Sequence, residues 1–323
     1  QNWEFLEHHL EPIAEIDSFL RILLDCRTEE ITQSKQLLVQ RNDFFLKKNE
    51  DRKLREVSIS AETTPAGSAL SHVELNTVSA SFPYLITQLS RLHRNLFEKD
   101  QFPEIVPNNP LSPVVDAFAQ AVCDYDSPDS VMLLISQPTE GNRFDQMGLE
   151  QLLWDEHKIP TVRKTLADVF EEGSLRQGHL VLDGKTVALS YYRAGYTPDD
   201  YRTIEAVKGR QLIEASSTIQ VPDLPMQLAG MKKIQQVLTR PEILSSFISA
   251  EISQRLVIAD IQGAKNDGFV RKMGKHFLVH LGLLRQTRKI RALHISELGT
   301  KQPDTFDHCW IEHIQIPWGF NIH

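Results

Sequence analysis

The sequence lacks the features that mark several classes of protein. Its three cysteines, Cys26, Cys123 and Cys309, lie far apart, which argues against a disulfide framework and suits a reducing compartment. We expect each to be a small buried side chain. The longest apolar run, 131–135, is far shorter than the ~20 residues that cross a bilayer, and the first residues lack a signal-peptide pattern. We therefore expect a cytoplasmic protein with no membrane partner.

Positive charge is also scarce. Lys and Arg number 35 against 43 Asp and Glu, giving a net charge of −8, and the basic residues are scattered along the chain. The electrostatic pattern of a nucleic-acid-binding protein is missing, so we expect no nucleic-acid partner. With 323 residues, of which 41% are hydrophobic, the chain is long enough for about two domains with a large core.

The first third of the chain is predicted to be mainly helical. Apolar residues at 13–24 recur at three- and four-residue spacing, which predicts one amphipathic helix. Residues 47–69 are polar and small, so we expect an exposed loop there. A second helix, before that loop, is expected to carry Ile31, Leu37, Leu38 and Phe45.

The middle of the chain has the pattern of an α/β unit. A proline-rich stretch at 103–113 predicts a domain boundary, after which helical spacing restarts. Strands interleaved with helices favour a partly parallel layered sheet. The expected elements are a strand at 131–136, a helix around 147–154, a strand near 161–163, a hairpin turning at Asp183–Gly184, and helices at 200–216 and 227–247.

A predicted strand carries a candidate magnesium pair. Glu74 and Asn76 lie two residues apart, so both project from the same face of this strand. A carboxylate and an amide oxygen suit Mg²⁺, whose remaining ligands are water and phosphates. Ser79 and Ser81 add hydroxyl groups where the strand gives way to a loop. The alternative is a solvent-exposed face of a half-buried strand.

Polar residues after two other strands suggest a ligand site. Glu140, Asn142 and Gln146 follow the first strand of the α/β unit at its carboxyl end, where open α/β sheets bind ligands. They suit an amino-acid-like ligand. The alternative is that they form a polar loop that caps a helix. Arg193 and Tyr196 follow another strand. This arginine is suited to a substrate carboxylate, with a structural ion pair as the alternative.

The remaining motifs exclude several kinds of chemistry. Lys232 and Lys233 begin a predicted helix and can either reach a phosphate or lie on the surface. No phosphate-binding P-loop and no nucleophile signature is present. The cluster at 308–313 contains two histidines, a cysteine and a glutamate but matches no standard zinc spacing. Covalent hydrolysis is therefore not expected.

Four segments together resemble the eukaryotic type of glutathione synthetase, a family of ATP-grasp ligases. They are HVELNTVSASF, EGNRFDQ, YYRAGY and QLAGMKKIQQVLTRP, in this order. The similarity runs with gaps over 41–244, and ISELG at 295–299 resembles one more family strand. The resemblance implies ATP- and Mg²⁺-dependent ligation of γ-glutamylcysteine with glycine, giving glutathione, ADP and phosphate, usually in a homodimer.

The resemblance also implies roles for individual residues. Glu74 and Asn76 match the magnesium ligands, with Glu74 also near ATP. Lys232 matches a lysine on the ATP phosphates, and Glu297 a nucleotide contact. The substrate-binding stretches are matched by Arg41, Val78, Ser79, Ala80, Ser81, Glu140, Gly141, Asn142, Gln146, Arg193, Ala194, Gly195 and Tyr196. A ligase of this kind stabilises charge on phosphoryl oxygens and needs no covalent nucleophile.

The implied fold is α/β (α+β overall), an ATP-grasp-like framework with an inserted three-layer α/β/α substrate-binding domain. We expect a helical and Mg/substrate-binding part at 1–113, the α/β domain at 114–225 and an incomplete ATP-grasp part at 226–323. The family closes two glycine-rich loops over its ligands, whereas no two of the fifteen glycines here are adjacent. The alternatives are a non-catalytic or truncated homologue that binds the peptide or pairs with a full-length subunit, and a chain whose residues 249–323 are not a genuine part of the fold.

Overall fold

The computed structural model describes residues 2–28, 33, 35–48, 68–96, 108–248 and 310–314. The chain forms two compact units, one of residues 1–42, 74–236 and 312–323 and one of residues 43–73 and 237–311. The domain divisions expected at 113 and 225 stay a prediction. The described helices are α1 Trp3–Ala14, α2 Ser18–Asp25, α3 Pro83–Leu96, α4 Leu111–Tyr125, α5 Arg143–His157, α6 Leu166–Glu172, η1 Pro198–Tyr201, α7 Ile204–Glu214, α8 Leu224–Ala229, α9 Lys232–Leu238 and α10 Pro241–Leu244.

A mixed sheet lies at the centre of the first unit. Within the described residues it has six strands, in the order β4-β3-β7-β6-β5, with β8 paired to β7. Strands β4, β3, β7 and β8 are parallel, and β5 and β6 add an antiparallel edge. The strands are β3 Val131–Ile135, β4 Thr161–Lys164, β5 Ser174–Arg176, β6 His179–Leu182, β7 Lys185–Tyr192 and β8 Ile219–Val221. The expected α/β class and partly parallel sheet are confirmed.

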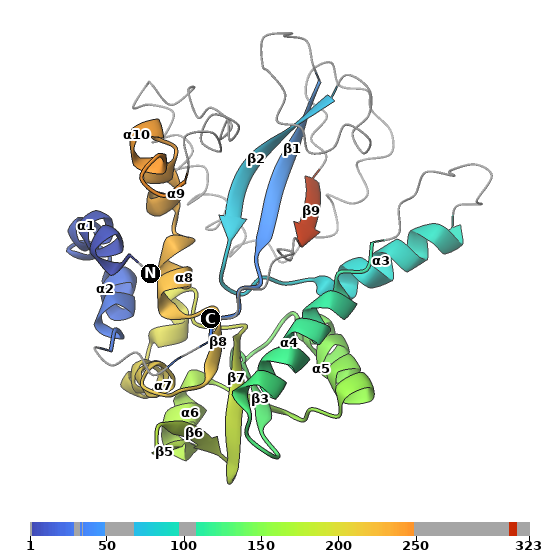
Figure 1. The fold of residues 1–323 in the computed structure, drawn as a ribbon, viewed down its shortest axis with the longest axis vertical. Helices are drawn as coiled ribbons and strands as arrows, with labels where there is room; N and C mark the ends of the chain where they lie inside the picture. Colours follow the sequence, from blue (N-terminus) through green and yellow to red (C-terminus); the bar gives the residue numbers. More distant parts are fainter. Residues whose placement is uncertain are drawn as a thin grey trace. The chain divides into compact units, whose positions relative to one another are not determined.

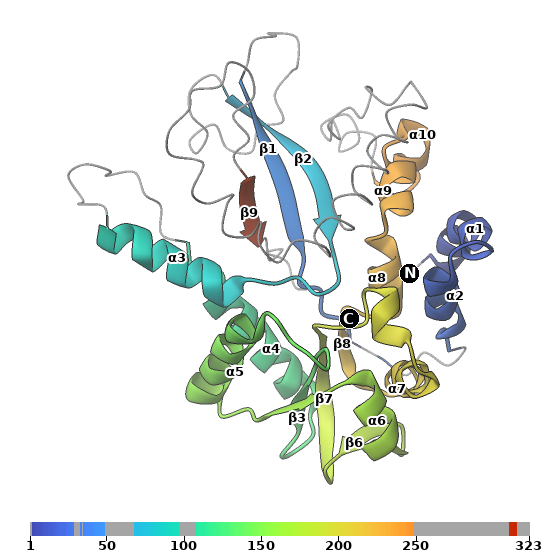
Figure 2. The ribbon, with the colours of Figure 1, turned by 180° about the vertical axis from the view of Figure 1, so that it is seen from behind.

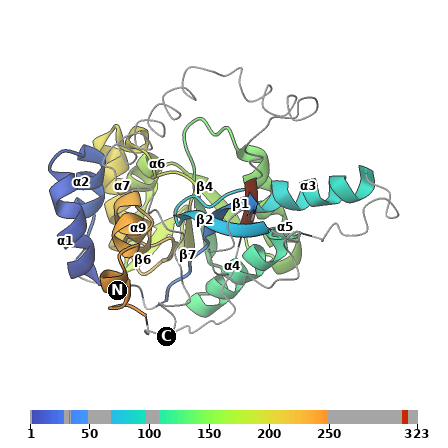
Figure 3. The same cartoon turned by 90° about the horizontal axis from the view of Figure 1, so that it is seen from above.

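Helices cover both faces of this sheet. Adjacent residues of β7 point to opposite faces, as a pleated strand requires. The Tyr191 ring packs against Phe118 of α4 with 4.9 Å between ring centroids, whereas the Tyr192 ring faces the Arg210 guanidinium of α7 at 4.3 Å. Helices α4 and α5 therefore lie on one face and α6 and α7 on the other (Figures 1, 2 and 3). This is the three-layer α/β/α arrangement that the resemblance implied.

The predicted hairpin is confirmed at its turn. Leu182 of β6 pairs with Lys185 of β7, which leaves two residues in the connection. Those two residues, Asp183 and Gly184, have φ of 50° and 76°. Positive φ at both positions is the geometry of a type I′ turn, and Asp-Gly is a favoured sequence for it.

The single helix expected at 13–24 is wrong, because the chain breaks between α1 and α2. The Asp17 carboxylate accepts hydrogen bonds from the backbone N–H groups of Phe19 and Leu20 at 3.0 and 3.1 Å, which starts a new helix. Ile16, counted in the expected apolar stripe, is 89% exposed. A local cap thus overrides the apolar spacing.

The second helix expected at 31–45 is also wrong where the structure describes it. Leu37 and Leu38 lie outside any helix, and Phe45 lies in strand β1, Arg41–Lys48. This strand pairs within a sheet of order β2-β1-β9, with β2 at Ser68–Asn76 and β9 at Trp310–Ile314. The conformation of this segment is set by pairing with strands that are distant in the sequence. The local spacing of apolar residues carries no information about such pairing. The expected loop at 47–69 lies largely outside the described residues.

The long helix expected at 227–247 is wrong as a single element, because the chain forms the short helices α8, α9 and α10. Gly230 follows α8, and a Cβ there would lie 2.0 Å from Thr77 Oγ1. Pro241 begins α10, where its missing N–H is not needed. The helix expected at 200–216 is confirmed over Ile204–Glu214 as α7, whereas the residues before it form the separate 3-10 turn η1.

The expectation that every cysteine is buried holds only in part. Cys26 is buried, but Cys123 on α4 is exposed. Cys309 lies outside the described residues, as do the side chains of the 308–313 cluster and the ISELG segment. In the described part of the chain, no helix is long and apolar enough to cross a membrane.

Candidate functional site

Two predicted site segments meet at the carboxyl edge of the central sheet. Strands β3 and β7 are parallel neighbours, and Ile135 pairs with Tyr192 at their ends. The Arg193 N–H donates to the Ile135 carbonyl at 2.9 Å and extends the ladder by one residue. The segments that follow, 136–142 and 193–197, therefore leave the sheet side by side (Figure 1). This is the edge at which parallel sheets of this kind bind ligands.

Asp200, at η1, joins these two segments. One carboxylate oxygen accepts from the N–H groups of Tyr196 and Thr197 at 3.1 and 3.0 Å and from the Thr197 hydroxyl at 2.9 Å. The other accepts from Gln137 Nε2 at 3.0 Å. Burial raises the pKa of the Tyr196 phenol, the Asp200 and Glu140 charges add to the increase, and Arg193 opposes it. Charged residues of both segments, Glu140 and Arg193, therefore influence the Tyr196 phenol.

Glu140 is held by a chain of side-chain hydrogen bonds. Its carboxylate accepts from the Asn142 N–H and from Gln146 Nε2, both at 2.7 Å. Gln146 is only 1% exposed, and its amide oxygen accepts from Arg163 of β4. Arg163 also donates to Glu150 at 2.7 Å. The expected residues Glu140, Asn142 and Gln146 are brought together, and Arg163 completes their support.

Arg193 connects this edge to the loop that follows β2. Its Nη1 donates to the carbonyls of Ser79 and Ala80 at 3.0 and 3.1 Å, and the Tyr191 hydroxyl donates to Ala80 O at 2.7 Å. Arg193 is 4% exposed, and its Nε has no hydrogen-bond partner among the described residues. The sequence predicted either a substrate carboxylate or a structural ion pair as the partner of Arg193, and bonds to backbone carbonyls were not expected. One donor of the guanidinium is therefore buried without a hydrogen-bond partner among the described residues.

The candidate magnesium pair and the candidate phosphate lysine lie in contact. Asn76 Nδ2 donates to Glu74 Oε1 at 3.1 Å. Lys232, 158 residues further along the chain, forms an ion pair with Glu74 Oε2. The Lys232 side chain is 53% exposed and the Glu74 side chain 19%. A carboxylate, an amide and an ammonium group at one place fit a Mg²⁺–phosphate ligand, whose cation would compete with Lys232 for Glu74.

Gln235 holds α9 against strand β2, next to Glu74 and Asn76. Its amide oxygen accepts from the Leu75 N–H at 3.0 Å, and its Nε2 donates to Leu75 O at 2.8 Å and to Gly230 O at 2.7 Å. Gln235 is three residues after Lys232, so both side chains lie on one face of α9. The close approach of Gly230 to Thr77 adds to this docking.

The remaining expected residues have varied surroundings. Val78 and Ser79 are half-buried, Ala80, Ser81 and Ala194 are buried, and Gly141 is exposed. Gly195 has φ of 88°, and its carbonyl accepts from Gln227 Nε2 at 2.8 Å. Gln227 in turn accepts from Arg210, which is fully buried in an ion pair with Glu214. Arg41 begins β1, and Glu297 lies outside the described residues.

Several supporting residues were not found by sequence reasoning, namely Asp145, Arg163, Asp200, Arg210, Gln227 and Gln235. A local signal existed for Asp200, because Thr197 and Asp200 form a capping box three residues apart. Arg210 and Glu214 also had a local signal, because they lie four residues apart on α7. The others contact partners far away in the sequence, for which no spacing rule gives a signal.

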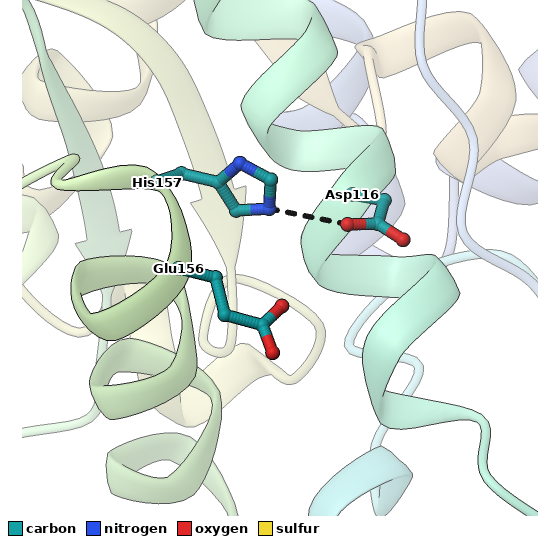
Figure 4. A group of neighbouring side chains, drawn as sticks. All are labelled: Asp116, Glu156 and His157. Carbon is teal, nitrogen blue, oxygen red and sulfur yellow. Dashed lines mark hydrogen bonds and ion pairs between the residues drawn. The ribbon is translucent and has the colours of Figure 1, made fainter.

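Two other features lie away from this edge. A cavity of about 1010 Å³ lies at the amino ends of the strands, next to Ser130, Pro160 and Lys185, and no expected site residue lines it. On the outer surface of α4 and α5, potential ligand atoms of Asp116, Glu156 and His157 lie within 4.8 Å of one another (Figure 4). All three are exposed, and His157 Nε2 already contacts Asp116 Oδ1 at 3.1 Å.

Comparisons with known proteins agree on one family. Residues 130–229 match the model of the eukaryotic glutathione synthase family. The chloroplastic glutathione synthetase of Solanum lycopersicum is 36% identical over 259 residues, covering 77% of this chain and 44% of that protein. The human glutathione synthetase is 34% identical over 260 residues, covering 78% of this chain and 52% of that protein.

A solved structure supports the fold. The glutathione synthetase-like effector of Globodera pallida, in its apo form, matches with a TM-score of 0.59 at 18% identity, covering 80% of this chain and 55% of that one. The chain spans about half the length of the curated relatives it matches. Over about three quarters of its own length, it is a relative of the eukaryotic glutathione synthetases.

Proposed function

We propose that this chain takes part in the ATP- and Mg²⁺-dependent ligation of γ-glutamylcysteine with glycine, which yields glutathione, ADP and phosphate. The observation that carries the proposal is the contact of Glu74 with both Asn76 and Lys232. These three residue types are the ones that a Mg²⁺–nucleotide needs, and they come from elements far apart in the sequence. The similarity to glutathione synthetases supplies the substrate class.

Glu74 and Asn76 would hold Mg²⁺, which when bound neutralises charge on the phosphoryl oxygens. Lys232 would then turn from Glu74 to the ATP phosphates. Its half-exposed side chain is long and flexible enough for that change. In this proposal, the nucleotide end of the site is built by β2 and the first turn of α9.

The dipeptide would lie where the loop 78–81 and the segments 140–146 and 193–196 come together. The Glu140 carboxylate suits the substrate ammonium group, and the free Nε of Arg193 suits a carboxylate. Ligation needs the dipeptide carboxyl to receive the phosphoryl group and the glycine amine to displace it. Since phosphate is the leaving group, the protein must orient these groups and limit access of water.

The test is ADP release from a mixture of the chain with γ-glutamylcysteine, glycine, Mg²⁺ and ATP. We expect Lys232→Ala to abolish release and to weaken ATP binding, because it removes the ammonium group from the site. Lys233→Ala is the matched control, since the Lys233 ammonium bonds Gln236 Oε1 on its own helix, at 3.5 Å. Equal effects of the two substitutions would contradict the assignment of Lys232.

A second candidate function is binding of the peptide without catalysis. It is favoured by the absence of adjacent glycines anywhere in the sequence, since a glycine-rich lid would protect an acyl phosphate from water. Saturable γ-glutamylcysteine binding by calorimetry with no ADP release would support this function over ligation.

We further propose a cytoplasmic homodimer whose partners are small molecules. The proposal rests on the family resemblance and on the charge and apolar patterns of the sequence. Sedimentation equilibrium would give the mass of the particle. A mass near 36.9 kDa at all concentrations would contradict the homodimer.

A further inference from the structure

The Asp145 carboxylate, in the first turn of α5, is bonded to the start of another helix. It is 2% exposed. One oxygen accepts from the Phe82 N–H at 2.8 Å, and the other accepts from the N–H groups of Tyr84 and Leu85 at 3.1 and 3.2 Å. No role was expected for this residue, although it lies within the EGNRFDQ segment. Its bonds begin immediately after the loop 78–81, which ends one residue before Phe82.

These bonds complete the first turn of α3. Phe82 precedes the helix and accepts from the Ile86 N–H at 2.8 Å, so it occupies the N-cap position. An N-cap side chain normally accepts from the second and third helical N–H groups, but phenylalanine has no acceptor. Asp145 accepts from those groups instead, and Pro83 at the first position has no N–H. Asp145 therefore caps α3 from a different helix.

Phe82 also has an unusual backbone conformation, with φ of 76°. A residue with a bulky side chain rarely adopts positive φ, and an N-cap residue normally has an extended conformation. Such a conformation persists only where its surroundings hold it. The Phe82 N–H points to Asp145 in this conformation, so the carboxylate is the group that stabilises it.

The loop 78–81 is thus held at its middle and immediately after its last residue. Arg193 and Tyr191 bond its carbonyls at residues 79 and 80, and Asp145 bonds the backbone immediately after it. If Phe82 returned to negative φ, the peptide before it would rotate and displace Ser81. The shape of the loop therefore depends on a charge that does not itself belong to the loop.

We propose that Asp145 is a positioning residue for the candidate substrate loop 78–81, which it shapes by holding Phe82 at positive φ. The substrate part of this inference rests on the proposed function. A purely structural role as a helix cap would change only stability and the exchange of the capped N–H groups of Phe82, Tyr84 and Leu85. The positioning role predicts in addition that the loss caused by removing the carboxylate depends on which side chain residue 82 carries.

The first experiment compares Asp145→Asn with Asp168→Asn. Asparagine has nearly the same shape as aspartate. It keeps only one acceptor oxygen, and its NH₂ group replaces the second oxygen and faces backbone N–H donors. We expect faster amide hydrogen exchange at residues 78–82, 84 and 85 and about a tenfold higher Kd for γ-glutamylcysteine, equivalent to about 1.4 kcal/mol. Asp168 caps α6 through the Thr165 N–H at 2.8 Å, so Asp168→Asn should lower the melting temperature without either change.

The second experiment adds a substitution at Phe82. Glycine adopts positive φ without steric penalty, whereas alanine does not. We expect Asp145→Asn/Phe82→Gly to recover most of the wild-type exchange pattern in residues 78–81 and most of the dipeptide affinity. Asp145→Asn/Phe82→Ala should recover neither, although it removes the same aromatic ring. Equal behaviour of the two double variants would overturn the proposal.

The readouts separate this inference from the proposed function. If the wild-type chain bound no γ-glutamylcysteine and released no ADP, the proposed function would fail. The exchange rates at residues 78–81 would still decide the role of Asp145, because they need no ligand. Unchanged exchange there in Asp145→Asn would overturn the positioning role, even if dipeptide binding had been observed.

Discussion

Cys26 and Cys123 have the same side chain in opposite surroundings. Cys26, directly after α2, is 1% exposed, and burial raises the pKa of its thiol to about 11, although the nearby Arg210 opposes the shift. Cys123 on α4 is exposed and lines the cavity at the amino ends of the strands. Because the thiolate is the reactive form, these surroundings set the order of reactivity.

Alkylation at pH 8 should therefore modify Cys123 in the folded protein and leave Cys26 unmodified. A thiol with a pKa of about 11 is ionised at that pH to about one part in a thousand. Peptide mass spectrometry after brief iodoacetamide treatment gives the extent at each position. Alkylation of Cys26 at the rate of Cys123 would contradict its burial.

The same shift predicts a pH dependence of stability. The pKa of Cys26 is raised above the ordinary value of 9.0, so the folded state favours the neutral thiol. The stabilisation is fully present below about pH 9 and is lost as the pH rises towards 11. Urea unfolding from pH 8 to 11 should show the wild type losing stability relative to Cys26→Ala. Parallel curves for the two proteins would contradict the assignment.

At the scale of elements, one glutamine docks α9 onto β2. Gln235 makes two hydrogen bonds with the backbone of Leu75, which lies between Glu74 and Asn76. The amide thus holds the helix that carries Lys232 against the strand that carries the candidate magnesium pair. Gly230, packed on Thr77, brings the preceding turn equally close.

Gln235→Ala should lower the free energy of unfolding by about 1–3 kcal/mol, because it leaves backbone groups of Leu75 without their partner. It should also weaken ATP binding more than γ-glutamylcysteine binding, since only the nucleotide end depends on α9. Gln236→Ala, at the exposed next position, is the control. Urea unfolding and calorimetry measure the two effects, and equal weakening of both ligands would contradict this division of the site.

At the scale of the whole molecule, the proposed ligands should stabilise the fold. A ligand that binds only the native state adds RT ln(1 + [L]/Kd), about 2.7 kcal/mol at a hundredfold excess over Kd. We expect Mg²⁺ and ATP together to raise the melting temperature more than ATP alone. In Glu74→Gln the part that depends on Mg²⁺ should be lost, because the amide is a weaker ligand for that ion.

Glu156→Gln is the control for this measurement. Glu156 belongs to the exposed group with Asp116 and His157 (Figure 4), which offers a competing place for a divalent ion. Its substitution should leave the Mg²⁺-dependent rise unchanged. If Glu156→Gln removed the rise and Glu74→Gln kept it, Mg²⁺ would bind at the α4–α5 surface instead of at β2.

Much of the fold could be predicted because the sequence signals for it are local. The Asp183–Gly184 turn depends on two adjacent residues that accept positive φ. Strand β3 is a run of five buried apolar residues, and the alternation around Glu74 and Asn76 placed both on one face. The errors arose where local and distant forces compete, as at Asp17, which ends an apolar stripe, and at Phe45, which joins a sheet.

The sequence by itself determined the elements of the central α/β unit, the side-chain chemistry available to a ligand, and the family that the chain resembles. Only the tertiary structure decided which groups meet: Lys232 with Glu74, Arg193 with the carbonyls of the 78–81 loop, and Asp145 with the start of α3. The physical reason is range. Turns, caps and strand faces depend on neighbours within about four residues, whereas these contacts join residues 60 to 158 positions apart and exist only once the chain has packed.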